Sequence, residues 1–190
     1  MKKLFIGVAM LIGATTAATA QEHAEFGVKG GLNLASFTGN NFPHKSLASV
    51  HFGVLEHIHL NKMWAIQPEV VYSVQGTKYT DESSDFRYAN SYINVPVLAQ
   101  LMTPVGVRFE TGPQVGFLVS AKNKSGNTTV DVKDQFKSTD VSWAFGVGYI
   151  TPARLGFDAR YNLGLTDVTK GESNVKNSVF QLGVFYQFHK

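Results

Sequence analysis

Six charged residues are spaced so that folding could bring them together inside the chain. Each lies in a stretch where apolar residues alternate with polar or small ones, and each falls on the polar side. The six are Lys29, Glu69, Arg108, Glu110, Asp158 and Arg160. Such charges could gate or select solutes, but charges in a dry interior have to be paired. Because three acids balance three bases, the set favours an internal ion-pair network with a structural role.

Three histidines have part of the spacing of a metal site. His57 and His59 share one side of an alternating stretch, and His51 lies further along the same side. Protein metal sites normally use three or four ligands, and no acidic residue converges on the pair. We therefore expect no bound metal here, only titratable side chains close to a turn.

The sequence gives little support for catalysis. Serines, histidines and acids are present, but none has a recognisable nucleophile context. Hydrolysis would need a nucleophile, a base and an orienting acid within hydrogen-bond reach. The lack of cysteine excludes thiol catalysis, disulfides and Cys-ligated zinc. The sequence thus predicts a protein that is not an enzyme and uses no cofactor.

Composition excludes nucleic acid as a partner. The chain has 190 residues, with 17 Lys and Arg against 14 Asp and Glu and no basic cluster along the sequence. Charged residues make up only 16% of it, against roughly 25% in a typical soluble protein. An aromatic content of 12% also excludes a disordered chain. One folded domain is expected.

The N-terminus has the pattern of a secretory signal peptide. Lys2 and Lys3 precede an apolar run over residues 4–12, and small residues follow, ending in Ala18-Thr19-Ala20. The apolar run is too short to span about 30 Å of hydrocarbon, which argues against an N-terminal membrane anchor. The pattern predicts export and cleavage after Ala20, with residues 1–20 removed and residues 21–190 forming the mature domain.

After the signal peptide, the chain alternates with a period of two residues and almost nowhere with a helical period. Alternation of this kind predicts β-strands with one apolar and one polar face. Eight such segments occur, at residues 26–34, 50–60, 64–75, 93–101, 107–119, 141–149, 155–164 and 180–188.

The connections between these segments alternate in length. Three are tight, near Asn61, Pro104 and Pro152. The other four are long and polar, at residues 36–46, 76–90, 120–140 and 166–177. Short turns on one side and long loops on the other are typical of a bacterial outer-membrane barrel. The sequence therefore predicts an all-β fold: an eight-stranded antiparallel up-and-down transmembrane β-barrel.

Composition decides which face of the strands is inside. The polar face consists mostly of Gly, Ser, Asn and Gln, which suits a narrow lumen better than a water-facing surface. The apolar face carries aromatics near strand ends, at Trp64, Tyr149, Tyr186 and Phe188, as expected at a lipid interface. A membrane barrel is favoured. The alternative is a soluble, lipocalin-like ligand-binding barrel with its apolar face inward.

Four residues fit this pattern badly. Glu56 falls on the lipid face, and a one-residue bulge near Val54 would turn it inward. Pro68, Pro96 and Pro113 lie inside strands, where each removes a donor from the hydrogen-bond ladder. We expect bulges or frayed pairing at these prolines.

Several short motifs, spread over most of the mature chain, carry a family resemblance. They are Lys29-Gly30-Gly31-Leu32-Asn33, Gln67-Pro68-Glu69 with Tyr72 and Gly76, Ile93-Asn94-Val95-Pro96, Gly112-Pro113, the Gly-rich stretch 145–149, Arg160-Tyr161-Asn162-Leu163-Gly164 and the C-terminal stretch 181–188. The chain resembles the PorT-like outer-membrane β-barrel family of Bacteroidetes-type bacteria. The resemblance implies this fold and a link to protein secretion across the outer membrane, but no catalytic motif.

The expected function is a non-enzymatic, structural or interaction role in the envelope, with accessory work in secretion as one form of it. The short turns are expected in the periplasm and the long loops outside, with the barrel surrounded by outer-membrane lipid. Loops 76–90 and 120–140 are the candidate contacts for protein partners, because Tyr79, Phe86, Tyr88 and Phe136 could bind a partner or pack over the barrel mouth. The alternative within the membrane is a barrel that handles small solutes or lipids.

Overall fold

The computed structural model describes residues 24–39, 45–81, 84–126, 128–171 and 174–188; of residues 79–81 and 84–86 it describes the backbone only. The predicted signal peptide, residues 1–20, lies outside the described residues. Within those ranges, no helix is long and apolar enough to cross a membrane.

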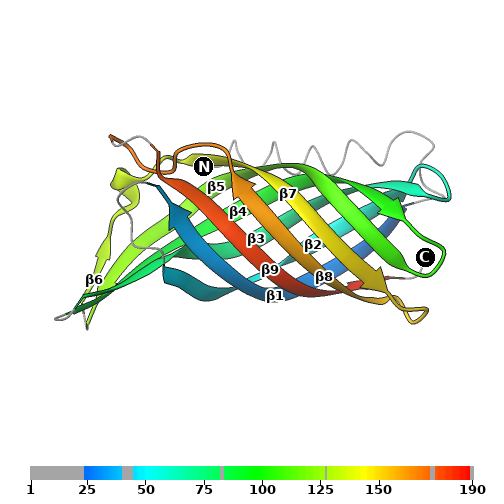
Figure 1. Cartoon of the computed structure of the whole chain (residues 1–190), viewed down its shortest axis with the longest axis horizontal. Helices are drawn as coiled ribbons and strands as arrows, with labels where there is room; N and C mark the ends of the chain where they lie inside the picture. The colour runs from blue at the N-terminus through cyan, green and yellow to red at the C-terminus, as the bar shows by residue number, and fades with distance from the viewer. Residues whose placement is uncertain (1–23, 40–44, 82–83, 127, 172–173, 189–190) are drawn as a thin grey trace.

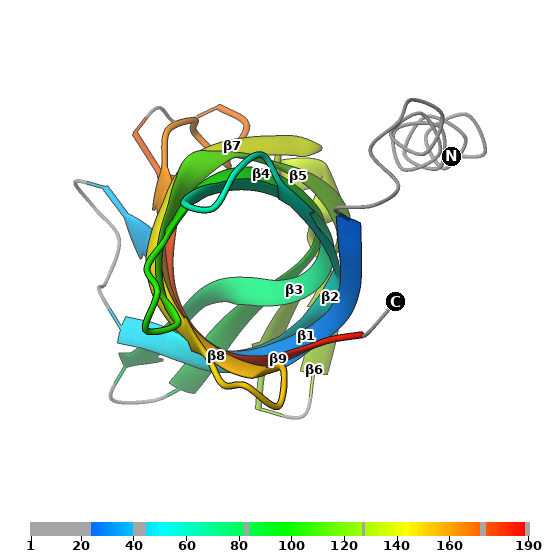
Figure 2. The same ribbon diagram turned by 90° about the vertical axis from the view of Figure 1, so that its right-hand side faces the viewer.

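Eight antiparallel strands close into a barrel whose ring is seen end-on in Figure 2. Each strand pairs with the next, and the last pairs with the first. This confirms the predicted fold. The strands, labelled in Figure 1, are β1 (Ala24–Thr38), β2 (Lys45–His59), β3 (Trp64–Asp81), β4 (Ser84–Met102), β5 (Val107–Ser125), β7 (Thr139–Ile150), β8 (Leu155–Gly164) and β9 (Lys176–Gln187).

The apolar faces of the strands point out of the barrel. On β1, Leu32 and Leu34 are 62% and 49% exposed, whereas Asn33 between them is fully buried. On β2, Phe52 is 58% exposed and its neighbour His51 only 2%. Such a continuous apolar surface is stable only when something other than water covers it. The predicted face assignment is confirmed, and the alternative of a barrel with its apolar face inward is wrong.

Tight turns join the strands at one end, which we call the short-turn end. After β2, the Asn61 Oδ1 atom accepts hydrogen bonds from the backbone N–H groups of Met63 and Trp64, both at 2.9 Å. The other two turns each use a residue with a positive φ, Gly106 at 90° and Arg154 at 64°. The three predicted tight turns are confirmed.

At the opposite end, which we call the extended end, strands continue where loops were predicted. The expected loop 76–90 is a continuation of β3 and β4, paired from Gly76↔Ala89 to Asp81↔Ser84. The expected loop 120–140 holds the end of β5, the short strand β6 (Thr128–Asp131) and the 3-10 helix η2 (Lys133–Gln135). β6 pairs only with β5 and stands outside the closed ring. These two expected loops are therefore corrected to a projecting sheet (Figure 1).

The three strand prolines interrupt the ladder on one side only. Each pairs with the strand that follows it, as Pro68 does with Val97 and Pro113 with Trp143. On the other side, pairing stops beside the proline and resumes without a change of register, because proline has no N–H to donate. Frayed pairing, predicted for Pro68, Pro96 and Pro113, is confirmed.

Glu56 differs from expectation. The β1–β2 register runs unbroken from Ala24↔Ile58 to Ala35↔Leu47, so there is no bulge near Val54 that would turn Glu56 inward. The irregularity in β2 lies nearer its start, between Ser46 and His51. Glu56 keeps its outward register position, yet it is only 8% exposed and interacts with other groups of the chain.

Candidate functional site

Arg160 is the centre of an ion-pair cluster halfway along the lumen. Its side chain points inward from β8 and is buried. The guanidinium donates to both carboxylate oxygens of Glu69 on β3, at 2.9 and 3.0 Å, and to Glu110 on β5 at 2.7 Å. A two-pronged arginine–carboxylate contact fixes geometry as well as charge. Arg160 thus ties three strands together across the barrel.

Lys29 adds a second cation to the cluster. From β1, its Nζ atom donates to Glu69 at 3.3 Å and to Asp158 at 3.1 Å. Asp158 also lies 3.8 Å from the Arg160 guanidinium. The cluster therefore holds two cations and three carboxylates, each within salt-bridge distance of an opposite charge. Such pairing is what makes buried charge tolerable.

Arg108 is the one predicted member that the structure places apart. It is buried and points inward from β5, nearer the short-turn end. Its guanidinium donates to the Gln187 side-chain oxygen at 3.1 Å and lies 5.8 Å from the Phe185 ring centre. Among the described residues, no carboxylate comes within 4 Å of it. The structure thus brings together five of the six predicted lumen charges.

Amide side chains complete the shell around the charges, and they were not among the predicted site residues. Gln67 donates to Glu69 at 2.8 Å, and Gln100 donates to Glu110 at 2.9 Å. Closer to the extended end, the Asn33 amide donates to the Ser73 hydroxyl at 3.0 Å, and its oxygen accepts from Gln181 at 2.9 Å. The sequence could have indicated them, because they fall on the inward side of their strands, and a buried polar side chain there needs a hydrogen-bond partner.

The histidines belong to this polar filling. The His51 Nδ1 atom lies 2.7 Å from the Asn33 side-chain oxygen, and the His57 Nδ1 atom lies 3.3 Å from that of Gln67. The rings of His57 and His59 meet edge to face, with centres 4.5 Å apart. Nowhere in the described ranges do three potential metal-ligating His, Cys, Asp or Glu side chains group together.

Side chains fill the lumen along its length. His57, Gln100 and Gln187, toward the short-turn end, expose at most 2% of their surface. Glu69 and Arg160, halfway along, also expose 2% each. A continuous water-filled channel would leave these side chains accessible. The described lumen is therefore packed shut.

An apolar cluster caps the polar lumen at the extended end. Phe136, just after η2, is 4% exposed and packs against Phe37 of β1 and Tyr88 of β4, with ring centres 6.0 and 6.4 Å away. The remaining members are Tyr92, Leu118, Ala121, Val132, Val168 and Val175. We call this set the mouth cluster. Phe136 thus packs in the mouth, one of the two roles considered for the aromatics of loop 120–140; the side chains of Tyr79 and Phe86 lie outside the described part.

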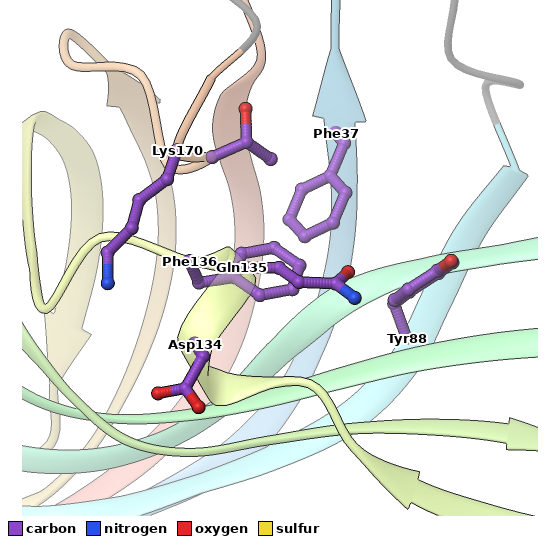
Figure 3. Close-up of a pocket in the computed structure, with 7 residues that line it drawn as sticks. Phe37, Tyr88, Asp134, Gln135, Phe136 and Lys170 are labelled. Atoms are coloured by element: carbon purple, nitrogen blue, oxygen red, sulfur yellow. The ribbon is translucent and has the colours of Figure 1, made fainter.

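A pocket of about 340 Å³ opens beside the mouth cluster (Figure 3). Three aromatic side chains and four polar residues surround it, contributed by β1, β4, the η2 segment and the β8–β9 connection. The volume is at the lower end of the range for small-ligand sites. Its lining is Phe37, Tyr88, Asp134, Gln135, Phe136, Thr169 and Lys170.

The pocket residues could not be placed from the sequence. Only Tyr88 and Phe136 had been named, as aromatics within polar stretches. The backbone brings the other walls together: the Lys137 N–H donates to the Val168 carbonyl at 2.8 Å, and the Lys170 N–H donates to the Gln135 carbonyl at 2.8 Å. These bonds join two segments that are distant in sequence.

Solved structures share this fold. Neisserial surface protein A, from Neisseria, is 16% identical to this chain. The superposition covers 87% of this chain and 99% of that protein, with a TM-score of 0.60. Ail, the attachment invasion locus protein of Yersinia pestis, is 15% identical, with the same coverage and a TM-score of 0.52. At these identities, the likeness shows the fold alone.

The comparison with protein families goes further than the fold. Among curated proteins, no match was found. The family described as outer membrane protein beta-barrel domain matches residues 19–170, well over half of the chain. The match covers most of the barrel, including the strands that carry the lumen charges and the apolar outer face. This chain therefore belongs to the outer membrane protein beta-barrel domain family, and its place is the outer membrane.

Proposed function

We propose that this protein is a non-enzymatic contact protein of the outer membrane, with the barrel as its anchor and the extended end as its binding surface. The observation that carries the proposal is the contrast between the filled lumen of the barrel and the open pocket at its extended end. The lumen is packed shut by paired polar side chains, while a pocket opens among the strand extensions. In barrels of this kind the long connections face the cell exterior. The filled lumen argues against a solute path.

The chemistry of the pocket favours a ligand or partner side chain with both a ring and polar groups. Tyr88 and Phe136 offer aromatic surface, while Asp134 and Lys170 offer opposite charges at the edge. Aromatic surface beside polar groups is typical of recognition sites. Ail of Yersinia pestis, similar in fold, has been crystallised with the heparin analogue sucrose octasulfate.

The PorT-like resemblance makes a secretion component one candidate partner. An accessory role in protein export would use the same extended end, because it is the part of the protein that projects from the barrel. Identifying the partner therefore tests both the general proposal and this narrower form of it.

Purified protein in planar lipid bilayers is expected to show no stepwise ion conductance. Residues with 2% exposure or less occupy the lumen at successive levels, which leaves no continuous water path. A general porin in the same bilayers serves as the positive control. Discrete channel openings from this protein would contradict the closed lumen.

A photo-crosslinking residue at Gln135 is expected to capture a partner on intact cells. Gln135 is exposed at the pocket edge. The matched control is Val105, which is 72% exposed in a turn at the opposite end of the barrel. The proposal requires a discrete product from Gln135 that Val105 does not give. No product at Gln135, or the same product at both positions, would count against it.

A further inference from the structure

Four cations form one straight row across the projecting sheet. Lys45 of β2 pairs directly with Lys78 of β3, Lys78 with Arg87 of β4, and Arg87 with Lys124 of β5. Residues directly opposite in an antiparallel pair point to the same face, about 5 Å apart. All four side chains are exposed. We call this set the basic row.

The basic row lies on the outer face of the sheet. The β3–β4 register runs unbroken from Val71↔Asn94 to Asp81↔Ser84. Alternation along β3 therefore gives Lys78 the same side as Val74, and alternation along β4 gives Arg87 the same side as Ile93. Both apolar residues belong to the outward face of the barrel. The row thus faces away from the barrel axis and from the mouth pocket.

The row has no counter-charge in the described part of the chain. None of the four side chains makes an ion pair or a side-chain hydrogen bond to another described residue. Like charges directly opposite on neighbouring strands are destabilising. In contrast, the nearby Lys122 has Asp131 of β6 directly opposite. Four exposed cations side by side favour an anionic partner.

The position of Lys78 within the row points to that partner. Lys78 is four residues beyond Val74 on β3, which for a tilted strand is about 10 Å further along the barrel axis. The phosphate groups of a bilayer begin just beyond its hydrocarbon core. Long Lys and Arg side chains reach back toward that interface. We propose that the basic row binds the phosphate groups of outer-leaflet lipid, so that the projecting sheet is held at the membrane surface.

The test uses the folded full chain in neutral detergent micelles, titrated calorimetrically with short-chain phosphatidic acid. The test variant is Lys78→Gln/Arg87→Gln. The matched control, Lys133→Gln/Lys137→Gln, removes the same charge from the same end of the barrel but not from the face of the row. A heat-shift gel shows that each variant is folded before it is titrated.

The expected result is specific binding of phosphatidic acid over phosphatidylcholine. The test variant should bind on the order of 30-fold more weakly, since each of the two cations contributes about a fivefold gain in affinity for an anionic surface. The control should bind like the parent. Equal binding by the test variant, or an equal loss in the control, would overturn the proposal. Row-dependent binding of a soluble heparin oligosaccharide without binding of phosphatidic acid would also overturn it, in favour of a soluble polyanion. The crosslink expected at Gln135 does not depend on any of these outcomes.

Discussion

Replacing Arg160 with glutamine is expected to destabilise the barrel by about 3–5 kcal/mol, the range for removing one partner of a buried ion pair. Among the described residues, Arg160 is the only cation within salt-bridge distance of Glu110. It also donates two of the hydrogen bonds that Glu69 accepts. Without it, Lys29 alone remains to balance three buried carboxylates. The measurement is urea unfolding in lipid vesicles, with the folded fraction read on unboiled gels.

The charge count of the cluster supplies the control. Glu69→Gln also removes a central residue, but it leaves Lys29 and Arg160 balanced by Glu110 and Asp158. It should therefore cost less than Arg160→Gln. The double variant Arg160→Gln/Glu110→Gln restores the native excess of one carboxylate and should recover part of the loss. If Glu69→Gln were the more damaging single change, charge balance would not be what stabilises the lumen.

Alternation made the barrel and its faces predictable. Within the membrane each strand has lipid on one side and packed polar groups on the other, so residue type has to change at every step. Leu32, Asn33 and Leu34 illustrate this rule, with exposures of 62%, 0% and 49%. The inward direction of the six lumen charges followed from the same rule.

Alternation gives the side of a strand but not the height of a residue in the barrel. Height depends on the stagger between neighbouring strands. For this reason Arg108 and Arg160 both pointed inward in the prediction, yet only Arg160 reaches Glu69 and Glu110, while Arg108 meets Gln187. The stagger also creates the basic row, whose members are scattered along the sequence.

Beyond the membrane the alternating signal disappears. No lipid requires an apolar outer face on the extended β3, β4 and β5, so exposed polar residues such as Lys78, Arg87 and Lys124 are acceptable there and the sequence reads as loop. The mouth pocket was hidden for a related reason: its walls meet only because Phe136 packs on Phe37 and the backbone of Lys170 bonds to that of Gln135. Neither contact follows from local spacing.

Phe136→Ala is expected to release the mouth pocket without unfolding the barrel. A buried phenylalanine truncated to alanine costs about 3–5 kcal/mol. Here the substitution destabilises the short segment 132–137, which is held in place by the mouth cluster and by the pairing of Phe136 with Thr169. The eight strands are also held by their own ladder of backbone pairs, which does not involve Phe136, so the opening should remain local.

Hydrogen exchange on the reconstituted protein measures this effect. Residues 132–137 and 166–171 should lose protection in Phe136→Ala, while the strand amides inside the membrane keep theirs. The matched control is Phe145→Ala, which removes the same ring from a position on the outer face that is 52% exposed and should leave the mouth protected. Crosslinking from Gln135 should fall in Phe136→Ala alone, because the released segment no longer presents the pocket. Loss of protection throughout the barrel would instead mean that the mouth cluster stabilises the whole fold, and unchanged exchange at residues 132–137 would mean that Phe136 does not hold this segment in place.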